Sequence, residues 1–438
     1  MNAPAVIRPK ERDAIMQALS SGVVPRLGQR HIQVGRAGEL KALVGDVARI
    51  SDGGSSFRLI IGDYGAGKSF FLSLVKAVAL EQKLVATSAD LSPEKRLFAT
   101  GGQAVALYRE LVANLSTRSR PDGGALPAIV ERFISSSAAE ATDSDVAVQE
   151  VIARKLSELT EYVGGYDFAA VVAAYARGHE SGDEQLKSDA IRWLRGEFAT
   201  KTDARAALGV RTIVEDSTVI DHLKLLAGLV RKAGFEGMMV VIDEMVNLYK
   251  LAHGQSRASN YEQILRILND TLGSATGIGY VMAGTPDFLY DPRKGLYSYA
   301  ALQSRLAENP YAVDGVVDFT GPVIKLECLS PEDLFLLLVN IRTVVMSSPS
   351  ASHVDFPDEA IEAFMRHCSD RVGAAYFQTP RNVIKSFVSL LAILEQNPNI
   401  AWSELVANVE IEDDPGEDLS PDLAQDQDGD DSLATFSL

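Results

Sequence analysis

The stretch that decides the fold is Gly62-Asp63-Tyr64-Gly65-Ala66-Gly67-Lys68-Ser69, a complete Walker A motif of the form GxxGxGKS. The apolar residues 57–61 before it predict a buried strand, and residues 70–80 after it have the apolar spacing of a helix. A glycine-rich loop between a strand and a helix presents backbone N–H groups and the positive end of the helix dipole to phosphates. The sequence therefore predicts a phosphate-binding loop (P-loop), with ATP in contact with the motif and with Phe70 next to it.

A second motif supplies the acidic partners of this loop. Residues 238–244 form an apolar strand that ends in two adjacent carboxylates, as in a Walker B motif. Lys68 is expected to pair with the β- and γ-phosphates, while Ser69 and Asp243 hold Mg²⁺. Glu244 is expected to orient and polarise the attacking water. Because such a carboxylate serves hydrolysis rather than transfer to another acceptor, the pair of motifs favours ATP hydrolysis.

Three further residues are candidates for contact with the phosphates. Thr285 follows the apolar segment 277–284, so its hydroxyl could hydrogen-bond the γ-phosphate or the attacking water; its alternative role is to cap a turn. Arg381 begins an expected helix, where a cation without an anionic partner is unfavourable, and a phosphate contact would account for it. Arg305 lies between the last two expected strands and could serve a neighbouring subunit. Its alternatives are a surface ion pair and replacement in that role by Arg293.

Apolar segments with strand character alternate with helical segments, which is typical of an α/β fold with a parallel sheet. The strand segments are residues 57–61, 83–90, 237–242, 277–284 and 323–326. The expected division of the chain is the first part of the core with Walker A at 1–115, a helical insert at 116–225, the second part of the core with Walker B at 226–328, a helical lid at 329–409 and an acidic disordered tail at 410–438. Within the insert, residues 193–197 (Trp-Leu-Arg-Gly-Glu) are a distinctive sequence without a chemistry that we can assign.

Composition limits the class of protein further. The 438 residues include 42 Lys and Arg against 59 Asp and Glu, and this net charge of −17 argues against a protein that coats nucleic acid. Residues 410–438 hold 11 acidic and no basic residues, so residues 1–409 carry only −6. Two cysteines, scattered histidines and short apolar runs predict a cytoplasmic protein without a disulfide framework, a His/Cys metal site or a membrane span.

The order of the motifs resembles that of a known family. Val34-Gly35-Arg36, the GxxGxGKS loop, the Asp243-Glu244 pair and the three candidates above follow one another as in the AAA+ ATPases near the origin-recognition initiators and the STAND group. The Trp-Leu-Arg-Gly-Glu segment and the Ala-Gly-Thr-Pro sequence at 283–286 resemble, more narrowly, the BREX system ATP-binding proteins of the BrxD type and the related ATPase of the Shango defence system. The resemblance covers residues 10–405.

This resemblance implies a P-loop NTPase fold of the AAA+/ASCE type, with a large helical insert and a C-terminal helical lid. It implies ATP and Mg²⁺ as ligands, with Gly35 and Arg36 among the nucleotide contacts. It further implies Thr285 as sensor 1, Arg305 as an arginine finger in a homo-oligomer, and Arg381 as sensor 2. The implied partners are a helicase and other defence proteins, with foreign DNA as the target.

One departure from the family pattern is the length of the insert. The interval between the two magnesium-ligand candidates, from Ser69 to Asp243, is 174 positions, far longer than in a minimal AAA+ core. We therefore expect the insert to contact a partner or DNA. Because it lacks a dense basic cluster, contact with DNA through a partner is favoured over direct contact.

Three functions remain open on the sequence. The leading interpretation is an ATP-hydrolysing subunit of an antiphage defence system, which assembles or remodels a complex with a helicase, DNA or both. An ATP-gated binding module with little turnover would carry the same Walker residues, whereas a direct DNA-binding ATPase is disfavoured by the low basic content. The acidic tail is interpreted as solubilising, with a DNA mimic or a partner lure as alternatives.

Overall fold

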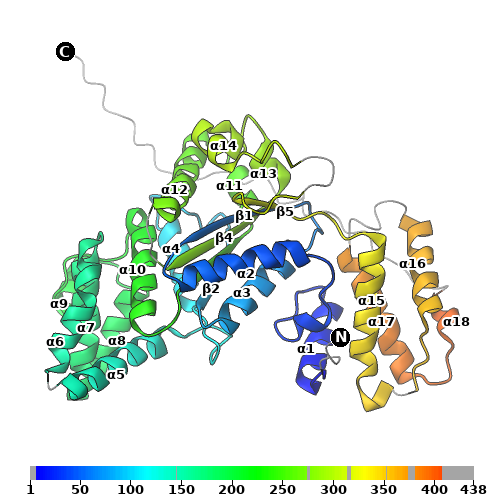
Figure 1. Cartoon of the computed structure of the whole chain (residues 1–438), viewed down its shortest axis with the longest axis horizontal. Helices are drawn as coiled ribbons and strands as arrows, with labels where there is room; N and C mark the ends of the chain where they lie inside the picture. Colours follow the sequence, from blue (N-terminus) through cyan, green and yellow to red (C-terminus); the bar gives the residue numbers. More distant parts are fainter. Residues whose placement is uncertain are drawn as a thin grey trace.

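The computed structural model describes residues 6–144, 146–273, 277–312, 317–351, 353–372 and 380–406. Within these residues, five parallel strands form one sheet in the order β2-β3-β4-β1-β5 (Figure 1). The strands are β1 (Ser56–Ile61), β2 (Val85–Asp90), β3 (Met238–Asp243), β4 (Ile278–Gly284) and β5 (Val323–Lys325). All of them overlap the segments expected from apolar character, so the prediction of a mixed α/β fold with a parallel sheet is confirmed.

Helices cover both faces of this sheet. They are α2 (Ala37–Ser51), α3 (Lys68–Glu81), α4 (Gln103–Ala113), α10 (Val219–Lys232) and α12 (Gly254–Gly273). On one face α2 and α3 pack against Ile60 and Val241, and on the other α4, α10 and α12 pack against Leu59 and Val240. Strands β1, β3 and β4 are consequently buried along their whole length. Their nearly continuous apolar sequences are those of parallel strands enclosed between two helical layers.

The strand register brings the carboxyl ends of four strands to one edge of the sheet. Ile61 of β1 lies opposite Gly284 of β4, and Asp243 of β3 lies opposite Asp90 of β2. Open parallel sheets bind their ligands beyond this edge, where the loops that leave the strands converge. The loop after β1 and the polar residues after β3 and β4 therefore share one region of space.

Shorter helices connect these elements. They are α11 (Val246–Tyr249), α13 (Pro286–Tyr290) and α14 (Ala300–Leu306), with 3-10 turns η1 (Gln29–His31), η2 (Ser157–Glu161), η3 (Asp216–Thr218), η4 (Leu296–Ser298) and η5 (Pro349–Ala351). Helices α11, α13 and α14 gather above the sheet in the view of Figure 1. No helix among the described residues is both long enough and apolar enough to cross a membrane.

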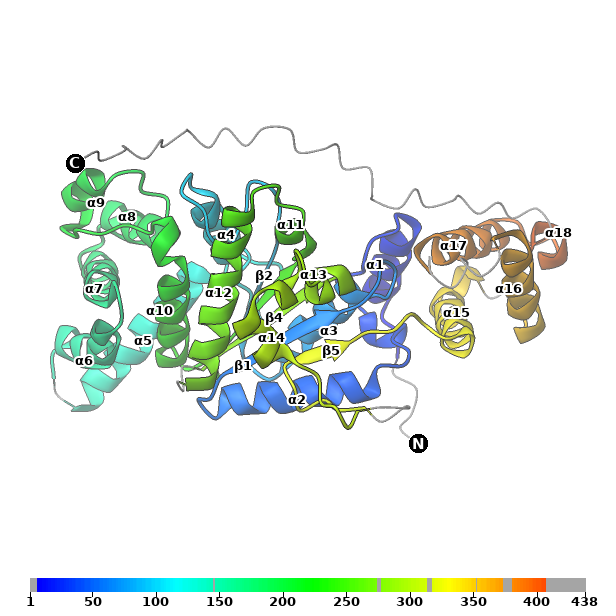
Figure 2. The ribbon, with the colours of Figure 1, turned by 90° about the horizontal axis from the view of Figure 1, so that it is seen from above.

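A helical insert lies at one end of the molecule, between α4 and α10 in the chain (Figure 2). Its helices are α5 (Leu126–Ser144), α6 (Val148–Leu156), α7 (Gly165–Ser181), α8 (Glu184–Leu194) and α9 (Lys201–Leu208). The distinctive residues 193–197 join the insert to the core. Trp193 is buried and donates its indole N–H to the carbonyl of Thr212 at 2.8 Å, while Tyr108 of α4 donates to the carbonyl of Leu194 at 2.8 Å. These contacts give the segment a packing role.

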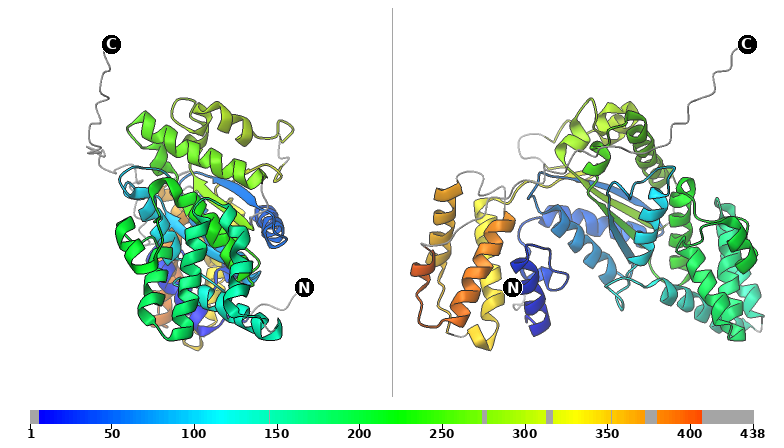
Figure 3. Two further views of the ribbon diagram at one scale, coloured as in Figure 1. Left: turned by 90° about the vertical axis from the view of Figure 1, so that its left-hand side faces the viewer. Right: turned by 180° about the vertical axis from the view of Figure 1, so that it is seen from behind.

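A second helical bundle lies at the opposite end of the molecule (Figure 3). Its helices are α15 (Pro331–Met346), α16 (Asp358–Val372), α17 (Pro380–Gln396) and α18 (Trp402–Val406). The N-terminal helix α1 (Pro9–Ser20) packs with them, because Ile15 and Leu19 share one apolar core with these helices. Arg12 of α1 also donates to both carboxylate oxygens of Glu395 at 2.9 Å. The start of the chain is thus fastened to its C-terminal bundle; the acidic tail at 410–438 lies outside the described residues.

Candidate functional site

The P-loop forms a concave turn of backbone between β1 and α3. Gly65 and Gly67 both adopt left-handed backbone angles, with φ of 82° and 80°. Such angles are strained for residues with a side chain, so glycine is required for this turn. Gly67 is the N-cap of α3, which begins at Lys68. The free N–H groups of the first helical turn therefore face the loop and form a ready site for phosphate.

Lys68 is held inside this loop by carbonyl oxygens. Its ammonium group donates to the carbonyls of Gly62 at 2.8 Å and Asp63 at 2.9 Å, and lies 5.4 Å from the centre of the Tyr64 ring. Burial lowers the pKa of Lys68, and the carboxylates of Asp243 and Glu244 partly oppose that shift. The lysine is thus a partly desolvated cation that donates hydrogen bonds to neutral carbonyls. Phosphate oxygens would replace these with stronger, charge-assisted hydrogen bonds.

The two candidate magnesium ligands lie in direct contact. The hydroxyl of Ser69 donates to Oδ2 of Asp243 at 2.8 Å, and Oδ1 of Asp243 accepts the backbone N–H of Glu244 at 2.8 Å. Asp243 is only 8% exposed, so both of its oxygens are oriented by protein groups. Oxygen ligands of this kind, supplemented by water and phosphate oxygens, suit Mg²⁺. Among the described residues there is no cluster of three or more His, Cys, Asp or Glu that could hold a metal without such help.

Glu244 lies at a sharp turn of the chain directly after β3. Its φ of 58° is uncommon for a residue other than glycine, asparagine or aspartate. The next residue, Met245, donates its backbone N–H to the carbonyl of Ala283 at 3.0 Å, which fixes the turn against β4. Strained backbone held by its surroundings is concentrated at functional sites.

Thr285 lies between the two Walker motifs because β4 lies between β1 and β3. It is 6% exposed and lines the same cleft as Lys68 and Glu244. The backbone N–H of Gly62 donates to the carbonyl of Gly284 at 3.3 Å, so the residue before Thr285 contacts the first residue of the P-loop.

Gly35 and Arg36 contact the protein around the P-loop. The guanidinium of Arg36 donates to the carbonyls of Ala66 in the P-loop, at 3.3 Å, and of Glu327 after β5, and pairs with Glu39 at 3.5 Å. Gly35 lies against Asp333 at the start of α15. Arg36 thus ties the N-terminal arm (residues 21–36), the P-loop and the connection to the bundle together at the wall of the cleft.

Arg381 reaches the cleft from the C-terminal bundle. It is exposed near the start of α17, lines the cleft and lies against Gly22 of the N-terminal arm. The structure therefore brings together residues 64–69 of Walker A, Asp243, Glu244, Thr285, Arg36 and Arg381 around one cleft of about 430 Å³, with Phe70 in its wall. Gly62, Asp63 and Gly35 are not among the residues that line it.

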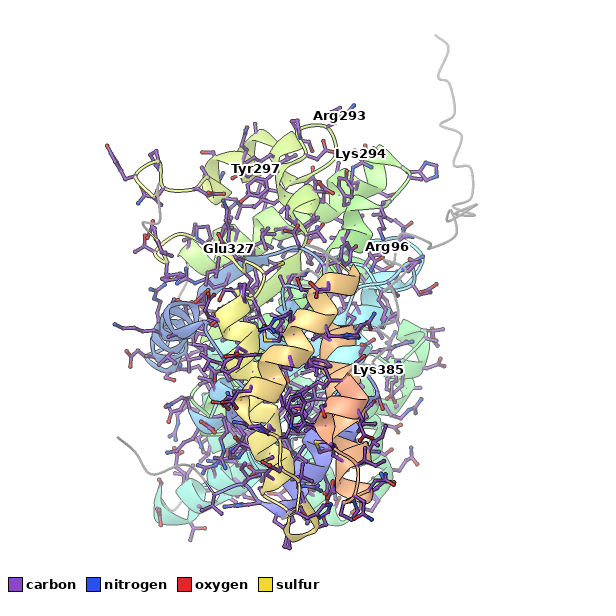
Figure 4. All side chains as sticks on the ribbon, turned by 90° about the vertical axis from the view of Figure 1, so that its right-hand side faces the viewer. Arg96, Arg293, Lys294, Tyr297, Glu327 and Lys385 are labelled. Carbon is purple, nitrogen blue, oxygen red and sulfur yellow. The ribbon has the colours of Figure 1, made fainter. Side chains whose placement is uncertain are left out.

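Arg305 is not part of this cleft. It is exposed on α14, donates to the carbonyl of Ala301 in its own helix at 3.0 Å, and lines a separate cavity of about 490 Å³. That cavity includes residues 54–58 at the beginning of β1, whereas the P-loop follows the end of the same strand. Arg293, the rival candidate, is also exposed, and Figure 4 shows it beside Lys294 at the top of the molecule.

The structure also brings residues to this edge that we did not select from the sequence. Asp90 ends β2 opposite Asp243 with its side chain exposed; partial desolvation by the surrounding protein raises its pKa, and repulsion from the carboxylates of Asp243 and Glu110 adds to that effect. The sequence signal that could have identified Asp90 is its position, because it is an acidic residue at the end of an expected strand. The N-terminal arm carried no such signal, because Val23, Pro25 and Ile32 enter the cleft wall only through tertiary packing.

Comparison with known proteins adds an independent finding. A family model described as "BREX system ATP-binding protein BrxC/D" matches residues 7–410, nearly the whole described chain. No curated protein matches the chain.

Proposed function

The chain belongs to the BrxC/BrxD family of BREX system ATP-binding proteins, and on that premise we propose that it binds ATP with Mg²⁺ in the cleft and hydrolyses it to ADP and phosphate. The observation that carries the proposal is the 2.8 Å hydrogen bond between Ser69 and Asp243. It joins the Walker A hydroxyl to the Walker B carboxylate, which are the two protein oxygens that such an enzyme needs beside its magnesium ion.

Each group around the cleft has a role in this reaction. Ser69 and Asp243 would hold Mg²⁺, which neutralises charge on the phosphates when it is bound. Lys68 and the backbone N–H groups at the start of α3 bind the phosphate oxygens. Glu244 orients the attacking water and withdraws its proton, while Thr285 hydrogen-bonds the water or the γ-phosphate. Arg381 adds positive charge from the C-terminal bundle.

The fold that we propose is the P-loop NTPase fold of the AAA+/ASCE type. Its support is the strand order, in which β4, with Thr285 at its end, separates the strand before the P-loop from the strand that ends at Asp243. The helical bundle would be the lid, and we assign α1 to it because Ile15 and Leu19 lie in its apolar core. We propose that the insert runs from 116 to 218 rather than to 225, because α10 (Val219–Lys232) as a whole packs against the sheet. The core then returns at 219–328, and the acidic tail starts at 410.

We propose a homo-oligomer in which Arg305 acts on the nucleotide of a neighbouring subunit. Its support is that Arg305 is exposed and lies in a cavity apart from the chain's own cleft. Without a second copy, the cleft would then lack one cation that stabilises the transition state. In related phosphoryl-transfer enzymes such a cation raises the turnover rate by about 10³-fold or more.

The biological role that we propose is ATP-driven assembly or remodelling of an antiphage complex in the cytoplasm, with a helicase and DNA among its components. Membership of a BREX family supports partners within that system. The insert is our candidate contact surface, since Val163 and Tyr166 are 61% and 77% exposed there. Apolar side chains exposed together are typical of surfaces that bind other proteins.

The test of hydrolysis is the Glu244→Gln variant of the full chain. We expect turnover of Mg-ATP to fall by about 10²–10⁴-fold, because the water loses its proton acceptor, while ATP still binds. The matched control is Glu236→Gln, an exposed carboxylate just before the other end of β3, which should leave turnover unchanged. Slow turnover that Glu244→Gln does not change would instead favour the ATP-gated binding module. Salt-dependent binding of the isolated protein to duplex DNA would favour the DNA-binding ATPase.

A further inference from the structure

The lining of the cleft has a polar part and an apolar part. The P-loop, Asp243 and Glu244 form the polar part, where we place the phosphates. Apolar side chains of the N-terminal arm and the C-terminal bundle form the apolar part, among them Val23, Pro25, Ile32, Leu337 and Ile384. A nucleotide with its phosphates on the P-loop would extend its base into this apolar part, because such pockets bind flat, largely apolar groups.

A single polar group among these side chains can orient the base and select it. The lining of the apolar part includes Gln33, between the buried Ile32 and the half-buried Val34. Gln33 is itself half-buried, and in the described part of the chain its side-chain amide has no hydrogen-bond partner. Nearby Gln29 differs in this respect, because its amide donates to the carbonyl of Pro25 at 2.7 Å and to the hydroxyl of Ser73 at 2.5 Å.

We propose that the Gln33 side chain selects adenine by reading its N6–N7 edge; this inference rests on the proposed function. The amide oxygen accepts from the N6 amino group and the amide N–H donates to N7. Guanine presents two acceptors, O6 and N7, at the same edge, so a glutamine amide can satisfy only one of them. The N-terminal arm, which lines the cleft, thereby also selects the nucleotide base.

The two hydrogen bonds between the Gln33 amide and adenine predict how Gln33 variants should bind ATP and GTP. The Gln33→Ala variant loses the bidentate pair, so its affinity for ATP falls by roughly 5- to 150-fold while its weaker affinity for GTP changes little. Gln33→Met keeps the length of the side chain but cannot form the hydrogen bonds, and it should behave as Gln33→Ala does. Agreement between the two variants excludes a cavity or a loss of packing as the cause.

The decisive probe is 7-deaza-ATP, in which a C–H group replaces N7. Binding is measured by calorimetry on the full chain. The unsubstituted protein should bind 7-deaza-ATP about tenfold more weakly than ATP, because one hydrogen bond is lost. Gln33→Ala and Gln33→Met should bind the two nucleotides equally. Gln29→Ala is the matched structural control: it should leave the ratio of the two affinities unchanged, because the Gln29 amide is already engaged by Pro25 and by Ser73 of α3.

The outcomes separate this inference from the proposed function. In one outcome, ATP binds and is hydrolysed, but the ratio of ATP to 7-deaza-ATP affinity is the same with and without the Gln33 amide. The inference about Gln33 then fails while the proposed function stands, and the backbone of the arm becomes the candidate for base recognition. If Gln33 variants weaken ATP, GTP and 7-deaza-ATP equally, Gln33 is structural and the inference also fails. If the unsubstituted chain binds no ATP, the proposed function fails with it.

Discussion

The hydroxyl of Ser69 donates a hydrogen bond of 2.8 Å to the carboxylate of Asp243, from which it is separated by 174 positions. Removing this hydroxyl in Ser69→Ala takes away one proposed magnesium ligand and the partner that orients the other. We expect the magnesium concentration required for half-maximal turnover to rise roughly 10- to 100-fold, by analogy with the loss of groups that orient metal ligands. A magnesium titration of ATP turnover measures it. Ser73→Ala on the same helix is the control and should leave the requirement unchanged.

Lys68 makes ATP binding dependent on pH. Burial lowers its pKa from the ordinary value of 10.5, so in the free protein it loses its charge at a lower pH than an exposed lysine does. Bound phosphates favour the charged form, and above the lowered pKa binding must therefore take up a proton. We expect the dissociation constant for ATP to rise with pH in this window, by up to about tenfold per unit. In Lys68→Arg the side chain stays charged, so a rise of the same size there would contradict this explanation.

The pair of Arg12 and Glu395 should stabilise the C-terminal bundle. The two hydrogen bonds of 2.9 Å are charge-assisted and largely shielded from water, with side-chain exposures of 17% and 19%. Arg12→Ala should therefore reduce the free energy of unfolding by about 1.5–3 kcal/mol, measured by denaturant unfolding monitored through circular dichroism. Arg30→Ala is the control, since Arg30 is 57% exposed in its pair with Glu11 and should cost about 1 kcal/mol or less. Equal losses would show that the Arg12 pair has no special role.

The insert should depend on Trp193 for its attachment to the core. This side chain is 1% exposed and contacts the rings of Phe168 in the insert and His222 in α10. Trp193→Ala should cost about 3–5 kcal/mol because it leaves a large cavity. Tyr166→Ala, at a position 77% exposed in the same subdomain, should change stability by about 0.5 kcal/mol or less. Thermal unfolding of the two variants compares them directly.

Local sequence signals predicted the sheet and the loop at its edge. Apolar segments of strand length gave the five strands, and the glycine pattern from Gly62 to Gly67 gave the turn, because both are set by residues that are adjacent in the chain. The expected position of Thr285 near the P-loop followed from the rule that parallel strands end at one edge. Its actual place between β1 and β3 required the strand order, which the sequence did not provide.

Features that depend on distant packing were not predictable in the same way. The helical spacing of α1 indicated an amphipathic helix, but nothing local to Ile15 or Arg12 indicated that its partners lie more than 300 positions later in the chain. The part of the cleft wall formed by Val23 and Gln33 likewise depends on packing between segments that are far apart in the chain. Arg305 could be identified as a candidate by its position between strands, yet its separation from the chain's own cleft emerged only from the structure.

That separation leads to a test of catalysis between subunits. A chain with Arg305→Ala has an intact cleft but no arginine for its neighbour, whereas a chain with Lys68→Ala has the arginine but a damaged cleft. Each alone should be inactive, with Arg305→Ala reduced about 10³-fold or more. Mixed oligomers contain interfaces where the intact arginine of one chain faces the intact cleft of the other, so activity should return on mixing. If each variant is inactive and no mixture recovers turnover, Arg305 does not act across the interface, whereas an active Arg305→Ala chain would remove it from catalysis altogether.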